Sequence, residues 1–501
     1  MRLVPLPGHS IGQVGVVMHT DGPALFFAAD HVLRQDWFVE DYAAGNLFGL
    51  VSASSDNRMH GLRLEGFENG AVSLLHDGPV TGQTLARNTV SGLEIDSPQS
   101  AIIHGGSHEG ATDTGNTWVD TRIVANAMDT EGGGIGVGPH ATTGDTFERT
   151  TVVGNWIVID EDGSDSSGGA AVGVSVDTVD NRISEAFLAH NAIRGTPEVA
   201  FFLNSAGAVG MGGAGPVLED VRVLGNQMQL DPAQHVTTGF GTTGIAVFAG
   251  DTFDGAEDSV TRRIEVRDNL IEGYGRQGVG IVAGCCGATG GLIEDVQITQ
   301  NVARGILLPR FQGGPHQLFY RGLAISGGGD ANNQVRDVTV ARNTVGIDND
   351  PDDVIGAELL AGGLVVEGVG PGPGNRATDV TIAKNLVDTE LIGLSVIGGL
   401  AQPGSPNEDN HVFGVEASRN LILQEPLLVH PAAPGVRAVS LIGGSGPLTP
   451  AGGVWSATAN SVSCVALEDN IVVGILDDHF LADNLGSGAA GNTASLSGCS
   501  P

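Results

Sequence analysis

A short pattern centred on an asparagine recurs along most of this chain and constrains its fold more than any other feature. In the copy Val338-Thr-Val340-Ala-Arg-Asn343-Thr-Val345, apolar residues stand five and three positions before the asparagine and two after it. Copies follow one another at roughly 30 to 50 residues, a period typical of solenoids. The asparagines of these copies are Asn88, Asn126, Asn155, Asn191, Asn226, Asn269, Asn301, Asn343, Asn385, Asn420 and Asn470.

The alternation before each asparagine predicts a β-strand with one buried face, and the asparagine predicts a bend because it tolerates left-handed backbone geometry. A glycine and a second alternating segment follow, as in Gly363-Leu-Val-Val366 and Gly393-Leu-Ser-Val396. Each copy therefore reads as one coil made of two or three short strands.

Such a coil cannot bury its apolar side alone, but stacked coils share one core and pair strand on strand. Stacking also places equivalent asparagines above one another, so we expect a ladder of side-chain amides. The pattern resembles the right-handed parallel β-helix proteins of the pectin-lyase-like superfamily. The resemblance implies an all-β solenoid of about eleven coils over residues 55–476, with a C-terminal cap and tail over residues 477–501.

Residues 1–54 lie outside the repeat. Pro7-Gly8-His9-Ser10-Ile11-Gly12, with Asp30 ending an apolar segment, resembles part of the metallo-β-lactamase-fold hydrolases, and the resemblance implies His9 and Asp30 as metal ligands. The cluster of further ligands that this family carries upstream has no counterpart, and a catalytic zinc needs three protein ligands. We therefore expect an N-terminal cap with a vestigial zinc site, and a metallo-hydrolase only as a remote alternative.

The charge of the chain excludes two classes of partner. Its formal net charge is −35 and its pI is about 4.4, so it should repel nucleic acid and anionic membranes. No apolar run is long enough to span a membrane. The first residues lack the apolar core of a signal peptide, although the implied fold favours an extracellular or cell-surface location. The oligomeric state stays open.

Two kinds of loop carry candidate functional residues. Asp160, Asp162 and Asp165 surround a glycine turn, and carboxylates at this spacing can converge on calcium; the alternative is a solvated acidic loop. The segment from His104 to Glu109 holds two histidines and a glutamate; we expect these side chains to be solvated in a loop, and metal binding is the alternative.

Motifs of polysaccharide-cleaving β-helix enzymes are not present as a set. If the chain has a catalytic groove, we expect its carboxylates just after the glycine strands, at Asp177, Asp180, Asp251 and Asp254. Only 5% of residues are aromatic, which is few for stacking sugar rings along a groove. We therefore favour a non-catalytic binding or structural surface module that interacts with carbohydrate. A polysaccharide lyase or glycoside hydrolase is the alternative.

Overall fold

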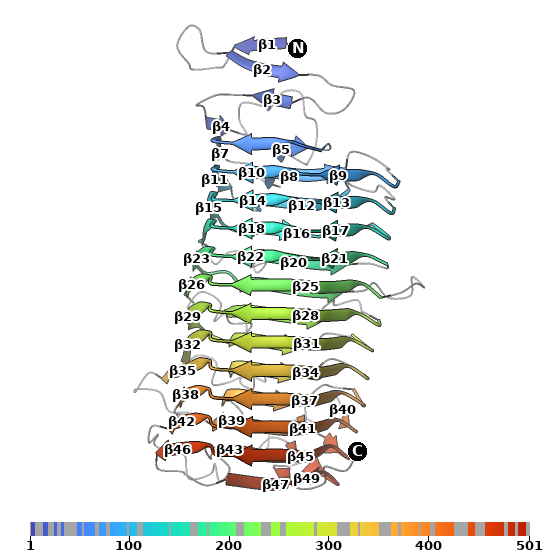
Figure 1. Cartoon of the computed structure of the whole chain (residues 1–501), viewed down its shortest axis with the longest axis vertical. Helices are drawn as coiled ribbons and strands as arrows, with labels where there is room; N and C mark the ends of the chain where they lie inside the picture. Colours follow the sequence, from blue (N-terminus) through green and yellow to red (C-terminus); the bar gives the residue numbers. More distant parts are fainter. Residues whose placement is uncertain are drawn as a thin grey trace.

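The computed structural model of the chain is a rod of stacked parallel coils (Figure 1). It describes short strands within residues 2–52 and most of the chain between residues 55 and 496. The described ranges are 2–5, 14–18, 25–27, 32–34, 48–52, 55–65, 70–76, 81–97, 100–107, 114–139, 142–160, 169–177, 180–206, 215–231, 242–250, 257–284, 288–307, 321–328, 331–349, 362–368, 372–389, 392–400, 406–424, 439–445, 456–474, 479–485 and 489–496. His9 and Asp30, and with them the expected zinc ligands, lie outside these ranges.

Three long parallel sheets run the length of the rod and meet at its corners. The first sheet contains seventeen strands: β6 (Arg58–His60), β9 (Thr84–Ala86), β10 (Thr89–Ser91), β13 (Thr117–Val119), β14 (Arg122–Val124), β17 (Thr146–Glu148), β18 (Thr151–Val153), β21 (Arg182–Ser184), β22 (Phe187–Ala189), β25 (Val217–Leu224), β28 (Val260–Arg267), β31 (Leu292–Thr299), β34 (Gln334–Ala341), β37 (Arg376–Ala383), β41 (His411–Ser418), β45 (Ser461–Glu468) and β49 (Thr493–Ala494).

The second sheet contains thirteen strands: β4 (Val32–Arg34), β7 (Arg63–Glu65), β11 (Glu94–Ser97), β15 (Ala127–Thr130), β19 (Trp156–Ile159), β23 (Ala192–Gly195), β26 (Gln227–Leu230), β29 (Leu270–Tyr274), β32 (Val302–Leu307), β35 (Thr344–Asn349), β38 (Leu386–Thr389), β42 (Leu421–Gln424) and β46 (Ile471–Gly474). The third also contains thirteen: β5 (Phe48–Ser52), β8 (Gly70–His76), β12 (Ile102–Ser107), β16 (Ile135–Val137), β20 (Ala170–Asp177), β24 (Val199–Ala206), β27 (Thr243–Ala249), β30 (Gln277–Val282), β33 (Arg321–Ser326), β36 (Gly362–Glu367), β39 (Ile392–Leu400), β43 (Val439–Ser445) and β47 (His479–Leu485).

The prediction of an all-β right-handed parallel β-helix is confirmed. Each coil passes from the first sheet through the second to the third, as β34, β35 and β36 do, and none of the described residues is helical. Consequently no described segment forms a helix that could cross a membrane. Two small sheets complete the structure: antiparallel β1 (Arg2–Pro5), β2 (Val14–Met18) and β3 (Leu25–Phe27), and parallel β40 (Pro406–Glu408), β44 (Ser456–Thr458) and β48 (Ala489–Ala490).

Strand pairing continues beyond both ends of the repeat seen in the sequence. β4 pairs in parallel with β7 and β5 with β8, so strands from the first 54 residues join the second and third sheets. Near the other end, β47 pairs with β43 and β49 with β45.

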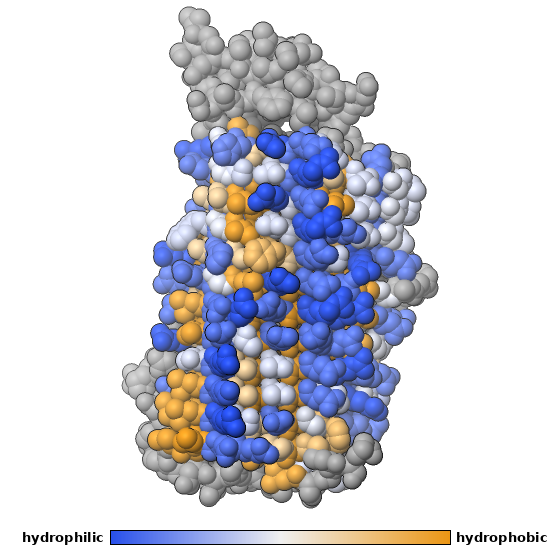
Figure 2. Space-filling view, viewed as in Figure 1, coloured by the Kyte–Doolittle hydropathy of each residue, from blue (hydrophilic) through white to orange (hydrophobic). Residues whose placement is uncertain are grey.

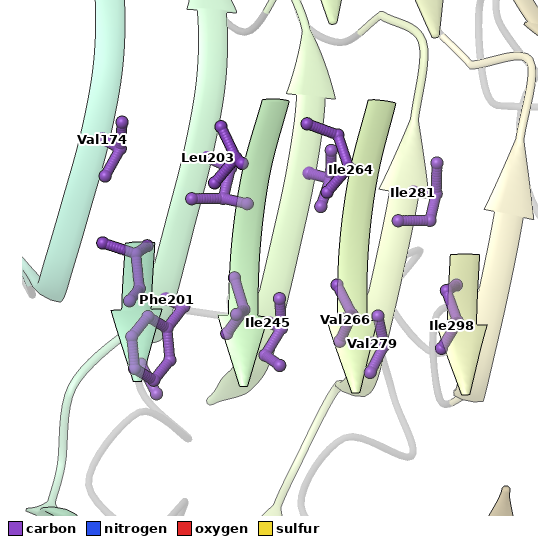
Figure 3. Packing of buried hydrophobic residues seen from close by; sticks show 14 of the residues in the cluster. Val174, Phe201, Leu203, Ile245, Ile264, Val266, Val279, Ile281 and Ile298 are labelled. Atoms are coloured by element: carbon purple, nitrogen blue, oxygen red, sulfur yellow. The ribbon is translucent and has the colours of Figure 1, made fainter. Parts of the chain in front are cut away.

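The core follows from the alternation of side chains along the strands. Val338 and Val340 of β34, Val345 of β35 and Val366 of β36 are all buried at the centre of one coil. Equivalent residues of successive coils stack, as Phe201, Ile245 and Val279 do along the third sheet (Figure 3). One continuous hydrophobic cluster therefore runs from Met59 to Val465, and no coil has a core of its own.

The expected asparagine ladder lies at the corner between the first and second sheets. Asn301 shows the arrangement, because its Nδ2 donates to Oδ1 of Asn343 on the next coil at 3.0 Å and its own Oδ1 accepts from Nδ2 of Asn269 at 2.9 Å. Ten residues form this ladder: Asn126, Asn155, Asn191, Asn226, Asn269, Asn301, Asn343, Asn385, Asn420 and Asn470.

The assignment of Asn88 to this ladder was wrong. In that coil the ladder position is Leu93, whose backbone N–H donates to Asn126 Oδ1. Asn88 instead accepts a hydrogen bond from Asn57 Nδ2 at 3.1 Å, at a bend within the first sheet. An asparagine suits either bend, so the sequence spacing alone did not separate the two positions.

A second ladder, which the sequence pattern did not reveal, lines the corner where the chain enters the first sheet. Asn333 Nδ2 donates to Asn375 Oδ1 at 3.1 Å, and Asn460 Nδ2 donates to Asn492 Oδ1 at 2.9 Å. The paired asparagines are 42 and 32 residues apart in the sequence, and only the stacking of the coils brings them together.

Candidate functional site

The outer face of the second sheet carries the most distinctive group of exposed side chains in its N-terminal half, on β11 to β26. Strand alternation turns Ile95, Met128 and Ile157 into the core. The same alternation turns Asp96 and Trp156 outward. These strands lie along the left edge of the rod in Figure 1.

Trp156 is the centre of this group, which we call the Trp156 face. Its residue surface is 41% exposed, although most large apolar side chains of the described residues are buried. Its neighbours in register on the adjacent coils are the small Ala127 and Ala192. The ring therefore projects above both neighbours. The guanidinium of Arg194 lies 4.7 Å from the ring centroid and holds the ring by a cation–π interaction.

Three carboxylates border the Trp156 face. Asp96 and Asp129 pair in register on neighbouring coils, and neighbouring strands are about 4.8 Å apart. Asp160 follows β19, one coil further along. Partial burial, followed by the charges of Asp96 and Asp160, raises the pKa of the Asp129 carboxyl. Asp129 therefore holds its proton more readily than an isolated aspartate does.

The sequence singled out only Asp160 of these residues. Asp96 and Asp129 occupy ordinary outward positions in two strands that are 33 residues apart in the sequence, and only the register places them side by side. A signal was nevertheless present, because Trp156 stands at an outward position directly after the ladder residue Asn155. An aromatic residue at that position in one copy of a repeat is unusual.

The other predicted site residues are distributed as follows. Asp177 ends β20, where only its backbone is described, and Asp180 is exposed at the turn into the first sheet, with φ of 61°. Asp162, Asp165, Asp251 and Asp254 lie outside the described ranges. Among the side chains that the structure describes, no three or more His, Cys, Asp or Glu groups are placed to hold a metal ion.

A second charged cluster, on the first sheet, is structural. The carboxylate of Glu219 is fully buried and forms ion pairs with Arg182, Arg262 and Arg263. Arg263 also pairs with Asp220 at 2.8 Å, and this hydrogen bond lowers the pKa of Asp220. Because its carboxylate is fully buried and its charge is balanced by arginines of its own sheet, we interpret Glu219 as a structural residue.

Glu219→Gln should destabilise the protein by about 2 kcal/mol. The change leaves three arginines around a neutral group, but each is more than a third exposed and keeps part of its hydration, so the cost stays below that of a fully buried pair. Urea denaturation monitored by circular dichroism measures this loss of stability. Glu265→Gln, which removes a less buried partner of Arg222 and Arg267, is the control and should cost less than half as much. Equal effects would contradict the structural role.

No family model and no curated protein matches the chain. Among solved structures it is similar to the A-module of a mannuronan C-5 epimerase from Azotobacter vinelandii, with 13% identity over 92% of this chain and 94% of that one and a TM-score of 0.33. It is also similar to the surface adhesin PfbA of Streptococcus pneumoniae, with 10% identity over 82% and 83% of the two chains and a TM-score of 0.37. At these values the likenesses carry nothing about the chemistry of this chain.

Proposed function

We propose that this protein is a non-catalytic β-helix module that binds a polysaccharide outside the cell or at the cell surface through the Trp156 face. The observation that carries the proposal is the exposed indole of Trp156, held by Arg194 and flanked by two alanines. The C–H groups on one side of a sugar ring pack against an aromatic face. Asp129 would supply a hydrogen-bonding partner for hydroxyl groups of the ring, and Asp96 and two exposed glutamines of β26, Gln227 and Gln229, would supply partners two coils away along the polymer.

The rod suits an elongated ligand. Outward positions repeat once per coil, about every 4.8 Å, so a polymer lying along the axis meets a new row of side chains at each coil. A sugar ring stacked on Trp156 would have Asp129 on one neighbouring coil and Arg194 on the other. Specificity would then come from the polar side chains, and affinity mainly from the indole, which the bound sugar would cover.

The test measures binding of the purified protein to a panel of neutral and acidic polysaccharides by affinity electrophoresis and calorimetry. Trp156→Ala should weaken binding at least tenfold, which corresponds to about 1.4 kcal/mol. Ile471→Ala, which removes another exposed apolar side chain of the second sheet, is the matched control and should bind as the natural protein does. Binding that is unchanged by Trp156→Ala, or no binding to any polymer, would refute the proposal.

One observation favours a second function, that of a glycoside hydrolase. The backbones of Asp96 and Asp129 pair in register, one strand spacing of about 4.8 Å apart, and two carboxyl groups about 5 to 5.5 Å apart are the arrangement of retaining enzymes. The raised pKa of Asp129 would suit a general acid, with Asp96 as nucleophile. Release of new reducing ends from any polymer, lost in Asp129→Asn, would replace the binding function by this one. Release of unsaturated uronates would indicate a lyase.

A further inference from the structure

The outer face of the first sheet carries two charged columns in its C-terminal half, on β31, β34, β37 and β41. An acidic column consists of Asp295, Asp337 and Asp379, which occupy equivalent positions within successive strands. A basic column consists of Arg342, Lys384 and Arg419, which occupy the bend directly before the asparagine ladder. All six residues are exposed and have φ between 55° and 60°, so each backbone bend turns its side chain out of the sheet.

A flat strip of small side chains separates the two columns. Thr339 and Ala341 on β34 pair in register with Thr381 and Ala383 on β37, and all four are half-buried. In the lower half of Figure 2, hydrophilic columns run on either side of this paler strip. Small side chains allow another surface to approach the sheet closely.

Charges in these columns are arranged differently from those in the N-terminal coils. In the N-terminal coils, acidic residues and arginines alternate at the position that the acidic column occupies further along. Their opposite charges pair between neighbouring coils, as in Arg87–Asp56 at 2.6 Å and Arg149–Asp120 at 2.7 Å. In the C-terminal coils like charges stand one coil apart, which is unfavourable. Within the described residues, ion pairs are formed by none of Asp337, Asp379, Arg342 and Lys384, whereas Arg419 pairs with Asp469 at 3.9 Å.

From this charge complementarity we propose that the face between the two columns docks a second copy of this chain. A two-fold axis parallel to the rod keeps every coil at its own level and exchanges the two ends of each strand. Asp337 then meets Arg342 of the second copy, and Asp379 meets its Lys384. The symmetry repeats both contacts, so four ion pairs form and the two strips of threonine and alanine pack on each other.

The size of this face is sufficient for a specific dimer. Four coils by one eight-residue strand span about 19 Å by 26 Å, so the two copies together would bury roughly 1,000 Å². That value lies at the threshold of about 1,000 Å² for a specific interface. The net charge of −35 opposes association, but salt at about 0.15 M screens charges beyond about 8 Å and preserves the direct contacts better than the long-range repulsion.

Sedimentation velocity at about 0.15 M salt tests the dimer with two double variants. On β34 and β37 and at the bends after them, R342E with K384E makes both columns acidic, and D337K with D379K makes both basic. We expect the natural protein to dimerise, each double variant alone to have a dissociation constant raised at least tenfold, and an equimolar mixture of the two to associate again as a heterodimer. The mixture restores every contact with opposite charges.

The control R63E with R304E changes the net charge by the same amount as R342E with K384E does, but on the second sheet, and should leave the dimer intact. Thermal unfolding shows whether each variant is folded. A monomeric natural protein at tens of micromolar would overturn the proposal. So would a dimer that both double variants preserve, or folded variants that do not associate when mixed. Because the Trp156 face lies on the second sheet, none of these results depends on polysaccharide binding.

Discussion

Asn301→Ala should lower the free energy of unfolding by about 3 to 5 kcal/mol. The side chain of Asn301 makes four hydrogen bonds inside the ladder: Oδ1 accepts from the backbone N–H of Asn269 at 3.0 Å and from its Nδ2 at 2.9 Å, and Nδ2 donates to the Val266 carbonyl at 2.9 Å and to Asn343 Oδ1 at 3.0 Å. Alanine leaves buried groups of the two neighbouring coils without partners, and each such group costs about 1 to 3 kcal/mol.

This loss is measured from urea unfolding curves monitored by circular dichroism. Gln300→Ala is the control, because Gln300 precedes Asn301, is exposed and lies outside the ladder; its replacement should change stability by less than about 0.5 kcal/mol. A loss for Asn301→Ala no larger than that of the control would show that the ladder contributes little. Because neighbouring coils support each other in a solenoid, a central rung should also matter more than the last rung, Asn470.

Lowering the pH from 7 to 4 should destabilise the natural protein by about 3 kcal/mol more than it destabilises His104→Leu. The imidazole of His104 is fully buried among the core aromatics, 5.2 Å from the ring centroid of Phe147, and this burial lowers the pKa of His104 to about 3. An unfolded histidine has a pKa of about 6.5. Between these two pKa values the unfolded chain binds one proton that the folded protein does not bind, so a lower pH favours unfolding. The contribution of neutral His104 to the free energy of unfolding is therefore complete above pH 6.5 and is lost as the pH falls toward 3.

The comparison between variants isolates this group, because the titrating carboxylates are common to both proteins and cancel in the difference. Chemical denaturation at pH 7, 5.5 and 4 provides the three points. His60→Leu, which removes an exposed imidazole, is the matched control. If His104→Leu and the natural protein lost stability in parallel, the imidazole would have to be protonated or hydrated within the fold, which would contradict its burial.

The coil repeat was predictable because its causes are local. Alternating valine and isoleucine, a glycine at or near the start of many strands of the third sheet and an asparagine at the bend recur within one coil. The alternation along the strands places Val338, Val340 and Val345 on the inward face, and all three are buried in the core. The same local signals misassigned Asn88, since the sequence around an asparagine does not show at which bend of the coil it lies.

His104 shows why the candidate sites were harder to predict. Glycines and a second histidine near it suggested a solvated loop, yet strand β12 continues through this residue and places its ring in the core. Only the pairing of β12 with its neighbours decides that its side chain points inward. Local composition cannot show this, because an inward and an outward position differ by a single residue.

By itself, the sequence determined a solenoid of β-coils with an asparagine ladder, since the repeat carries its own strand, bend and core pattern. The tertiary structure alone decided what lies on the outer faces. Asp96 and Asp129, Trp156 and Arg194, and the two charged columns of the first sheet each consist of residues from different coils. Loops of variable length separate these coils in the sequence, so the residues become neighbours only through the strand register, which the burial of the core maintains.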